Sequence, residues 1–261
     1  MKSISYAWPL PFVISRAGEL YRECHAATNR ERRKRPKRFD VINALLERTA
    51  DRRYLEIGVR NPDDCFHRIH ATYKLSVDPG YEDKVNRADF HMTSDEFFSK
   101  LDAGSLVLEQ REFDVIFIDG LHRADQAYRD IRNAMQWVAD VGYIVLHDCN
   151  PPTRHHAREV FRERGPAGPA WNGTTWKAFQ RIRTEVDKNC YVIDCDWGVG
   201  VIENHGESAA NRLSPEINAF YEYSVLDENR EMILNLVQPE DLTWLTEAGS
   251  GGEKTESRTG A

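Results

Sequence analysis

The chain has 261 residues, of which 41% are hydrophobic and 30% charged, and its formal net charge at pH 7 is −7. This length suits one large α/β domain with additional helices. The negative balance excludes a global attraction to nucleic acid or anionic membranes, and no stretch approaches the ~18 apolar residues of a membrane span. The five cysteines are an odd number without paired spacing, so we expect reduced thiols and a cytoplasmic protein.

The first fifty residues, 1–50, are predicted to be a helical segment that contains a basic run. Apolar residues recur at helical spacing in 39–48, and residues 15–27 are weakly amphipathic. Between these two segments, seven of the nine residues from Arg30 to Arg38 are basic. Such a run is either a solvated linker or a clamp for a phosphate or another anion, and nothing else in the sequence supports the clamp.

Short apolar runs alternate with amphipathic stretches from residue 51 to residue 205, which predicts an α/β core. The first expected strand contains Glu56 and ends at Gly58, and the second ends at Asp78. An acidic residue about twenty positions after a glycine turn has the spacing that nucleotide-type sites use to hold ribose hydroxyls. The alternative is that both acidic residues only cap turns.

A third, short strand at Phe90 is expected to lead into a helix whose N-cap is Thr93 or Ser94 and whose first turn contains Asp95. Asp95 therefore has a structural explanation, and equally a place beside a bound cofactor. A dinucleotide is the weaker candidate for that cofactor. The motif that binds a pyrophosphate needs three glycines, whereas this turn has Gly58 alone, followed by two acidic residues that would repel phosphates. A nicotinamide-dependent oxidoreductase is thus a disfavoured alternative.

The stretch from Phe113 to Pro152 carries the strongest functional signal. Two apolar runs end at Asp119 and Asp148, with His122 and His147 beside them. Each run predicts a buried strand, and the amphipathic segment between them is long enough for a crossover helix, so the two strands should be parallel. Their carboxyl ends then bring both acidic residues to the edge where open α/β sheets hold ligands. A lone histidine is more often structural, but these carboxylates favour a functional His122 and leave His147 open.

Beyond this stretch, residues 153–164 are predicted to be helical, and a Gly- and Pro-rich segment connects them to another helix. That segment is either a plain connection or a lid beside the site. His155 and His156 lie on the predicted helix and are interpreted as surface residues. Trp171 and Trp176 either stack on a substrate ring or pack in the core.

The C-terminal part is expected to close the sheet and then leave it. Residues 191–194 and 198–203 have the pattern of two strands joined in a hairpin. Residues 206–247 are predicted to form a C-terminal helical extension. Residues 248–261 have almost no apolar side chains, which predicts a disordered tail.

Together these residues resemble the class I S-adenosylmethionine-dependent methyltransferases, in the small-molecule branch whose motif Ile-Asp-Gly-x-His precedes a strand ending in an acidic pair. Here the motif is residues 118–122, and the resemblance extends from about Tyr54 to Pro152 and more loosely to Glu203. It implies a Rossmann-like doubly wound α/β sheet, mostly parallel with a C-terminal antiparallel hairpin. It also implies S-adenosylmethionine as the cofactor, next to the following residues: Glu56, Gly58, Asp78, Ser94, Asp95 and Asp119.

The chain also resembles macrolide sugar O-methyltransferases and, more remotely, catechol-type enzymes that hold magnesium at two strand ends. That resemblance implies His122 as the general base beside Asp119. It also implies a divalent metal, Mg²⁺ or Mn²⁺, held by Asp119 and Asp148, and His147 beside them is a candidate third ligand. The sugar enzymes have glutamate where this chain has His147, and the catechol type has asparagine where it has Cys149. Since magnesium prefers oxygen ligands, a site containing histidine suits Mn²⁺, Fe²⁺ or Zn²⁺ equally well.

The implied function is O-methylation of a hydroxyl on a small metabolite, such as a sugar or a glycosylated natural product. The alternative is a non-catalytic member of the fold that binds the cofactor or a metabolite without turning it over. A small-molecule acceptor is then the expected partner, without nucleic acid or membrane. The sequence leaves open whether the chain forms a homo-oligomer.

Overall fold

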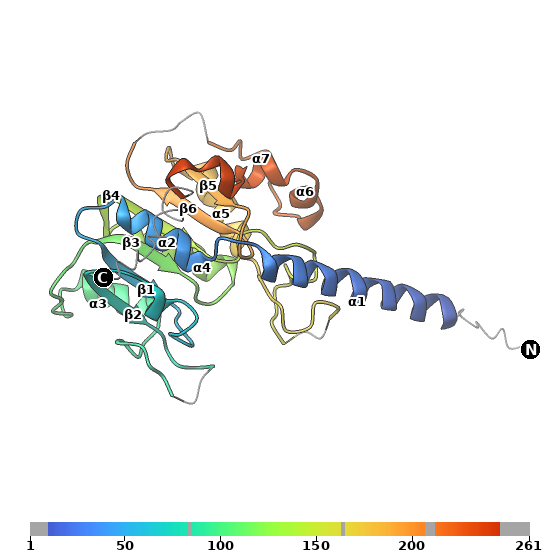
Figure 1. Ribbon diagram of the computed structural model, residues 1–261, viewed down its shortest axis with the longest axis horizontal. Coiled ribbons are helices and arrows are strands. Elements are labelled where there is room, and N and C mark those ends of the chain that lie inside the picture. Colours follow the sequence, from blue (N-terminus) through green and yellow to red (C-terminus); the bar gives the residue numbers. More distant parts are fainter. Residues whose placement is uncertain (1–9, 83–84, 163–164, 207–211, 246–261) are drawn as a thin grey trace, which may run out of the picture.

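The computed structural model describes residues 10–82, 85–162, 165–206 and 212–245. Within these residues, seven strands form one sheet in the order β2-β1-β3-β4-β6-β5-β7 (Figure 1). The strands are β1 Arg53–Ile57, β2 Tyr73–Val77, β3 Phe113–Ile118, β4 Val138–Leu146, β5 Cys190–Ile193, β6 Val199–Glu203 and β7 Leu236–Val237.

The sheet is parallel in its first half and antiparallel at the hairpin. Strand β1 pairs in parallel with β2 and β3, and β3 pairs in parallel with β4. Strand β6 then runs antiparallel to both β4 and β5. The predicted doubly wound, mostly parallel sheet with a C-terminal antiparallel hairpin is therefore confirmed. The two-residue edge strand β7, which pairs in parallel with β5, was not predicted.

Seven α-helices accompany the sheet in the described residues. They are α1 Leu10–Arg33, α2 Arg38–Glu47, α3 Ser94–Asp102, α4 Ala124–Ala134, α5 Thr175–Glu185, α6 Tyr223–Glu228 and α7 Arg230–Leu234. None of the helices in this part of the chain is both long and apolar enough to cross a membrane.

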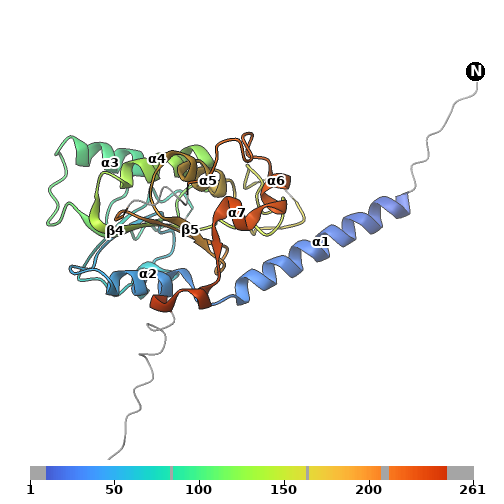
Figure 2. The ribbon, with the colours of Figure 1, turned by 90° about the horizontal axis from the view of Figure 1, so that it is seen from above.

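The alternation of side chains along the strands explains how helices cover both faces. In β3, Val115 and Phe117 belong to the apolar cluster that includes α2, whereas Ile116 and Ile118 belong to the cluster that includes α3, α4 and α5. Because successive residues of a strand point to opposite faces, a strand that is apolar throughout requires a helix layer on each side. Figure 2 shows α3, α4 and α5 on one side of the sheet and α2 on the other.

Helix α1 extends away from the body of the protein toward the N-terminus (Figures 1 and 2). Among its described side chains, the buried ones are Cys24, Ala27, Thr28 and Glu31, which recur on one helical face near the end that meets the body. The hydroxyl of Thr28 lies 3.0 Å from Nε2 of His156, so this end of α1 is attached to the loop that follows β4.

The helix predicted for residues 153–164 is wrong, because turns and bends take its place in the described residues up to 162. The hydroxyl of Thr153 accepts a hydrogen bond from the backbone N–H of His155, a local bond that competes with helix formation. The guanidinium of Arg158 donates to the carbonyls of His155 and Phe161. These bonds engage acceptors that a helix would have used.

The interpretation of His156 as a surface residue is also wrong. Its side chain is fully buried, with Nδ1 2.8 Å from the hydroxyl of Thr153. Two further expectations are met only in part. The strand at Phe90 is reduced to a single bridge with Val77. The helical extension after residue 206 consists, in the described residues, of the short helices α6 and α7, a 3₁₀ turn at Pro239–Asp241 and helical residues at 243–245. The domain division 1–50, 51–205 and 206–247 stays a prediction, and the tail predicted for 248–261 lies outside the described residues.

Candidate active site

The site is built where β3 and β4 end. Asp119 directly follows β3, and Asp148 lies two residues beyond β4, its parallel neighbour. The backbone of Asp148 has φ of 60°, in the left-handed region that non-glycine residues rarely adopt. Such a conformation costs on the order of 1–3 kcal/mol and is concentrated at functional sites. The strain supports a functional interpretation of this strand end.

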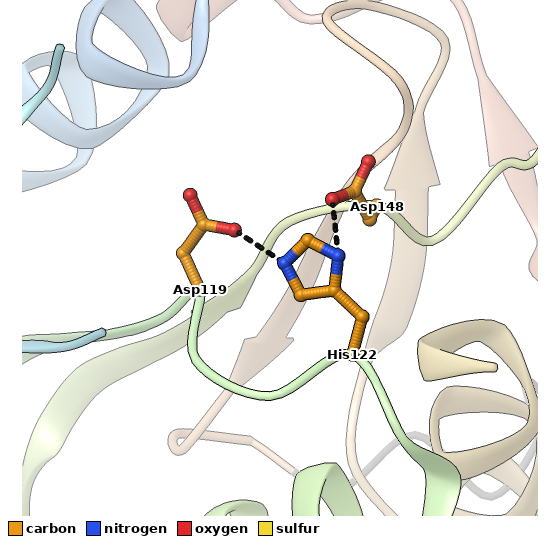
Figure 3. A group of neighbouring side chains, drawn as sticks. All are labelled: Asp119, His122 and Asp148. Carbon is orange, nitrogen blue, oxygen red and sulfur yellow. Dashed lines mark ion pairs between the residues drawn. The ribbon is translucent and has the colours of Figure 1, made fainter. Parts of the chain in front are cut away.

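His122 lies between the two carboxylates, as Figure 3 shows. Its Nε2 is 3.3 Å from Oδ1 of Asp119, and its Nδ1 is 3.1 Å from Oδ2 of Asp148. The same Nδ1 is 3.1 Å from the backbone carbonyl of Trp171. Because a carbonyl can only accept, Nδ1 carries the proton in the neutral ring, and Nε2 is the basic nitrogen. The indole of Trp171 stacks on the imidazole, with 5.1 Å between ring centroids.

His147 is the second imidazole at this edge and is more deeply buried than His122. Its Nδ1 lies 3.3 Å from Oδ1 of Asp119 and 3.3 Å from Oδ2 of Asp148. Its Nε2, which has no hydrogen-bond partner, lies 3.6 Å from Oδ2 of Asp196. His147 therefore stands between the carboxylates of the site on one side and a third carboxylate behind it.

The charged groups of this cluster shift one another's pKa values. Burial alone would raise the pKa of Asp119, but His147, His122 and Arg38 outweigh it and hold that pKa well below its usual range. Burial alone would lower the pKa of His122, but the carboxylates of Asp148 and Asp119 raise it to about 9. The same carboxylates raise the pKa of His147. In the free protein at neutral pH, His122 is therefore protonated.

The basic run of the N-terminal segment ends in this cluster. Arg38 donates to Oδ2 of Asp196 at 3.2 Å, and its Nε lies 3.7 Å from Oδ2 of Asp119. Lys37 pairs with Oδ1 of Asp196 at 2.9 Å, and Lys34 pairs with Asp194 at 2.6 Å. The favoured interpretation as a solvated linker is therefore wrong for these three residues, which neutralise acidic groups at the end of the sheet.

The predicted site residues all line one cavity of about 630 Å³ at the carboxyl ends of β1 to β4. They are Glu56, Gly58, Asp78, Ser94, Asp95, Asp119, His122, His147 and Asp148. The two tryptophans have different environments. Trp171 lines the cavity, whereas Trp176 is fully buried in the core.

Gly58 is required by the close approach of two loops. Its φ is 86°, and a Cβ at this position would lie 2.4 Å from the Cα of Gly120 and 2.5 Å from the carbonyl of Asp119. Asp78 anchors the same turn, because its Oδ2 accepts the backbone N–H groups of Val59 and Arg60 at 2.9 and 3.0 Å. The turn after β1 is thus held directly against the loop that carries Asp119.

Glu56 and the N-terminal end of α3 also contribute polar side chains to the cavity. Burial raises the pKa of Glu56 to about 8, although its carboxylate accepts a 2.5 Å hydrogen bond from the hydroxyl of Tyr54. At the other end, Thr93 is the N-cap of α3 and accepts the N–H of Glu96, as one of the two predicted caps. Ser94 and Asp95, which follow it, both accept from the amide of Gln126 at 3.1 Å.

The cluster also fits a divalent metal. One ligand atom from each of Asp119, His122 and Asp148 lies within 4.8 Å of the others. Two ligand atoms held by one metal at tetrahedral or octahedral angles are about 3.0–3.5 Å apart, given bond lengths near 2.1 Å. The nitrogen–oxygen distances of 3.1 and 3.3 Å around His122 and His147 agree with that spacing. The donor set of carboxylate oxygen and imidazole nitrogen suits Mn²⁺, Fe²⁺ or Zn²⁺.

Residues 66–149 match the sequence model of a protein family described as a methyltransferase domain. This stretch, about a third of the chain, is similar to a methyltransferase domain. The prediction of a methyltransferase is confirmed by this match, and the predicted fold by the sheet order. The match ends at Cys149, directly after Asp148, so the domain includes both strand ends of the site. No curated protein matches the chain.

Solved structures of methyltransferases are similar to this chain only at low identity. An O-methyltransferase from Bacillus cereus in complex with SAH has 12% identity, 72% of this chain and 90% of that chain covered, and a TM-score of 0.40. A SAH-bound methyltransferase from Podospora anserina has 13% identity, with 78% and 99% covered and a TM-score of 0.38. The O-methyltransferase TomG from Streptomyces achromogenes, in complex with SAM, has 10% identity, with 72% and 90% covered and a TM-score of 0.38.

Several residues around the methyltransferase site escaped the sequence analysis. Arg38 and Asp196 reach it from segments far apart in the chain, and Asn172 donates to Oδ1 of Asp148 at 2.8 Å. A weak signal existed for two of them: Asn172 precedes a glycine, and Asp196 begins the Asp-Trp-Gly turn of the hairpin. Turn signals of this kind locate a loop without indicating what the loop contacts.

Proposed function

We propose that the protein transfers the methyl group of S-adenosylmethionine to a hydroxyl of a small metabolite, with His122 as the general base. The observation that carries the proposal is the placement of His122 between the carboxylates of Asp119 and Asp148, inside the cavity that also contains Gly58 and Asp78. One cavity thus combines a cofactor half and a proton-accepting half.

The cofactor half has the charge that this cofactor requires. S-adenosylmethionine carries a sulfonium and an ammonium but no phosphate. Glu56 and Asp130 line the cavity with pKa values that burial raises. The other acidic side chains still outnumber the lining arginines and histidines together, and they are Asp64, Asp78, Glu82, Asp95, Asp119 and Asp148. A cavity of this sign attracts a cation and repels a phosphate. Oδ1 of Asp78 accepts only the N–H of Gly80 among the described hydrogen bonds, so it retains capacity for a ribose hydroxyl.

The chemical step assigned to His122 is proton removal from the acceptor. The carbonyl of Trp171 holds the proton on Nδ1, so Nε2 is the atom that accepts the hydroxyl proton. Because the pKa of His122 is raised to about 9 in the free protein, the ring must first lose a proton. The positive charge of the bound cofactor lowers the pKa of an imidazole in the same cavity, which favours the neutral base. The cofactor would supply the methyl group to the oxygen that His122 has deprotonated, and its sulfonium would become a neutral thioether.

We further propose that Asp119, Asp148 and His147 hold a divalent metal. We assign His147 as the ligand and His122 as the base, because the carboxylate of Asp196 lies 3.6 Å from Nε2 of His147, the ring nitrogen that faces away from Asp119 and Asp148. His122, in turn, has the more exposed side chain. A metal in this position would lower the pKa of an acceptor hydroxyl.

The acceptor half supports a sugar or a glycosylated natural product as the acceptor. Phe161 and Trp171 line this part of the cavity, and their rings pack at 5.3 Å between centroids. Apolar ring faces beside carboxylates suit a molecule that has both apolar ring surfaces and hydroxyl groups. The proposed partner is therefore a small molecule.

Isothermal titration with S-adenosylhomocysteine tests the cofactor, since this product analogue needs no acceptor. We expect saturable binding, and absence of binding at millimolar ligand would refute the proposal. A methyl-transfer assay with labelled S-adenosylmethionine, run over a panel of sugars, glycosylated natural products and catechols, then identifies the acceptor class. Labelling of amine or thiol acceptors alone would contradict O-methylation.

The role of His122 is tested with His122→Asn, and exposed His70→Asn serves as the matched control. We expect His122→Asn to retain S-adenosylhomocysteine affinity and to lose about 10²–10⁴-fold in turnover, the usual contribution of a general base. His70→Asn should change neither quantity. Full turnover in His122→Asn would remove His122 as the base. Loss of Mn²⁺ binding in that variant, but not in His147→Asn, would reverse the two histidine assignments.

A further inference from the structure

Asn172 is a fully buried side chain in contact with Asp148. Its Nδ2 donates to Oδ1 of Asp148 at 2.8 Å and lies 3.3 Å from the carbonyl of Trp197. The other oxygen of Asp148, Oδ2, faces His122 and His147. The two oxygens of this carboxylate thus have different partners, and Asn172 engages the one that points away from the histidines.

The residues beside Asn172 fix His122. The carbonyl of Trp171 accepts from Nδ1 of His122 at 3.1 Å, and the N–H of Thr174 donates to the carbonyl of His122 at 2.8 Å. The hydroxyl of Thr174 also accepts the N–H of Ala124 at the start of α4, at 2.8 Å. The segment Trp171–Thr174, hereafter the clasp, therefore holds both the ring and the backbone of His122.

The clasp depends on a glycine and is attached to buried structure. Gly173 has φ of 62°, and a Cβ there would lie 2.0 Å from the carbonyl oxygen of His122. The N–H groups of Asn172 and Gly173 both donate to the carbonyl of His156, at 3.0 and 3.1 Å. His156 is itself fully buried, with its ring between hydroxyls of Thr28 and Thr153. The clasp is therefore hydrogen-bonded to His156, a buried residue that does not line the cavity.

The orientation of the Asn172 amide indicates what it is for. Its Oδ1 is buried and has no hydrogen-bond partner, whereas its Nδ2 serves two acceptors. Leaving a buried acceptor such as Oδ1 unpaired is unfavourable. The two hydrogen bonds that Nδ2 donates must offset this cost, so the donor is the functional part of the side chain. The donor meets the strained strand end, since Asp148 has φ of 60°.

We propose that Asn172 is a positioning residue that orients the Asp148 carboxylate, so that Oδ2 faces His122 and His147. The inference rests on the proposed function, because it assigns Asn172 a role in the same metal and proton-transfer site. Without the donor, the Asp148 carboxylate can rotate about its side-chain torsions and withdraw Oδ2. Outer-sphere residues that orient a metal ligand commonly change metal affinity by about 10–100-fold.

Titration of the full-length protein with Mn²⁺ tests the proposal in Asn172→Ala and Asn172→Leu. The leucine variant fills a similar volume without a donor, so it separates loss of the hydrogen bond from a cavity. We expect both variants to bind Mn²⁺ at least about tenfold more weakly than the wild type, with S-adenosylhomocysteine affinity unchanged. Unchanged Mn²⁺ affinity in both variants would overturn the proposal.

Asn218→Ala is the matched control. Asn218 is also buried, and its Nδ2 also serves two acceptors, Gln180 and the carbonyl of Glu222, but it does not line the cavity. Its replacement should lower the melting temperature without changing Mn²⁺ affinity. An equal loss of Mn²⁺ affinity in Asn218→Ala would show that Asn172 acts only through general stability, and would overturn the proposal.

A second measurement tests the role of Asn172 independently of the proposed metal centre. If the wild type does not bind Mn²⁺, the proposed metal centre fails, and the ring signals of His122 in a ¹H–¹⁵N spectrum decide the role of Asn172. A positioning role predicts that these signals move in Asn172→Leu and stay in place in Asn218→Ala. Signals of His122 that are unchanged in Asn172→Leu would overturn the inference.

Discussion

Replacing Glu56 by glutamine tests whether the buried carboxyl at the end of β1 is neutral in the free protein. Burial raises the pKa of Glu56 from 4.5 to about 8. Only 2% of the residue is exposed, and its closest polar partner is the hydroxyl of Tyr54 at 2.5 Å. Glutamine keeps the size of the side chain and can accept the same hydrogen bond, but it has no charge to bury.

The magnitude follows from the two pKa values. The folded state binds the proton more tightly than the unfolded state, so Glu56 lowers the free energy of unfolding as pH rises from 4.5 toward 8. At 1.36 kcal/mol per pKa unit, the full effect is about 5 kcal/mol, of which about 3 kcal/mol falls between pH 5 and pH 7.5. The Glu56→Gln variant should therefore gain about 3 kcal/mol over the wild type across this interval.

Urea denaturation at pH 5 and pH 7.5, without cofactor, measures this difference. The change in relative stability between the two pH values isolates Glu56, because the other titrating groups are common to both proteins. Exposed Glu109→Gln is the control and should follow the wild type at both pH values. Parallel stability profiles for Glu56→Gln and the wild type would refute the reasoning, since they would mean that Glu56 ionises normally despite its burial.

Three further substitutions have defined outcomes. Gly58→Ala should destabilise the protein by about 2–3 kcal/mol and weaken S-adenosylhomocysteine binding in a titration, because its positive φ and the 2.4 Å approach to Gly120 leave no room for a Cβ. Asp196→Asn should cost about 3 kcal/mol in urea denaturation, since it leaves the partly buried cations of Lys37 and Arg38 without their carboxylate. Burial lowers the pKa of His156 to about 4, so acidification below pH 6.5 should lower the melting temperature of the wild type by several degrees more than that of His156→Gln.

The strands and their acidic ends were predictable because local physics determines them. An apolar run such as that of β3, buried at every position, has no stable alternative to the centre of a covered sheet. A crossover helix forces the next strand to be parallel, and this alone places Asp119 and Asp148 at one edge. Thr93 was predictable for a similar reason, since N-caps use a local side-chain bond.

What the sequence could not show depends on partners distant in the chain. The segment after residue 152 has an amphipathic pattern that suggests a helix. In the structure, however, the guanidinium of Arg158 donates to the carbonyls of Gly168 and Ala170, and a helix would not allow that arrangement. His156 is buried because Thr28, which is 128 residues earlier, meets its ring. Asn172 acquires its role only once the chain brings it to Asp148, which no local pattern indicates.

The basic run shows why composition misleads near a site. From the sequence, seven positive charges in nine residues suggest either a solvent-exposed linker or a binding site for an anionic ligand. In the structure, the carboxylates of Asp194, Asp196 and Asp119 already serve as the anions for Lys34, Lys37 and Arg38. These pairs bind the start of α2 to the ends of the strands.

The same pairs explain why so many acidic groups can be gathered at one sheet edge. Without Arg38 and Lys37, the carboxylates of Asp119, Asp148 and Asp196 would repel one another, and the protein would have to protonate one of them. The imidazoles of His147 and His122, together with Arg38, lower the pKa of Asp119, and His147, Arg38 and Lys37 lower that of Asp196. A monovalent cation that enters the cavity can then replace one imidazolium proton, and a divalent ion can replace two, without changing the net charge of the cluster. An edge that is charge-balanced when empty thus keeps carboxylates available for a cationic cofactor or a metal, and it links their binding to release of the proton that His122 must lose to act as a base.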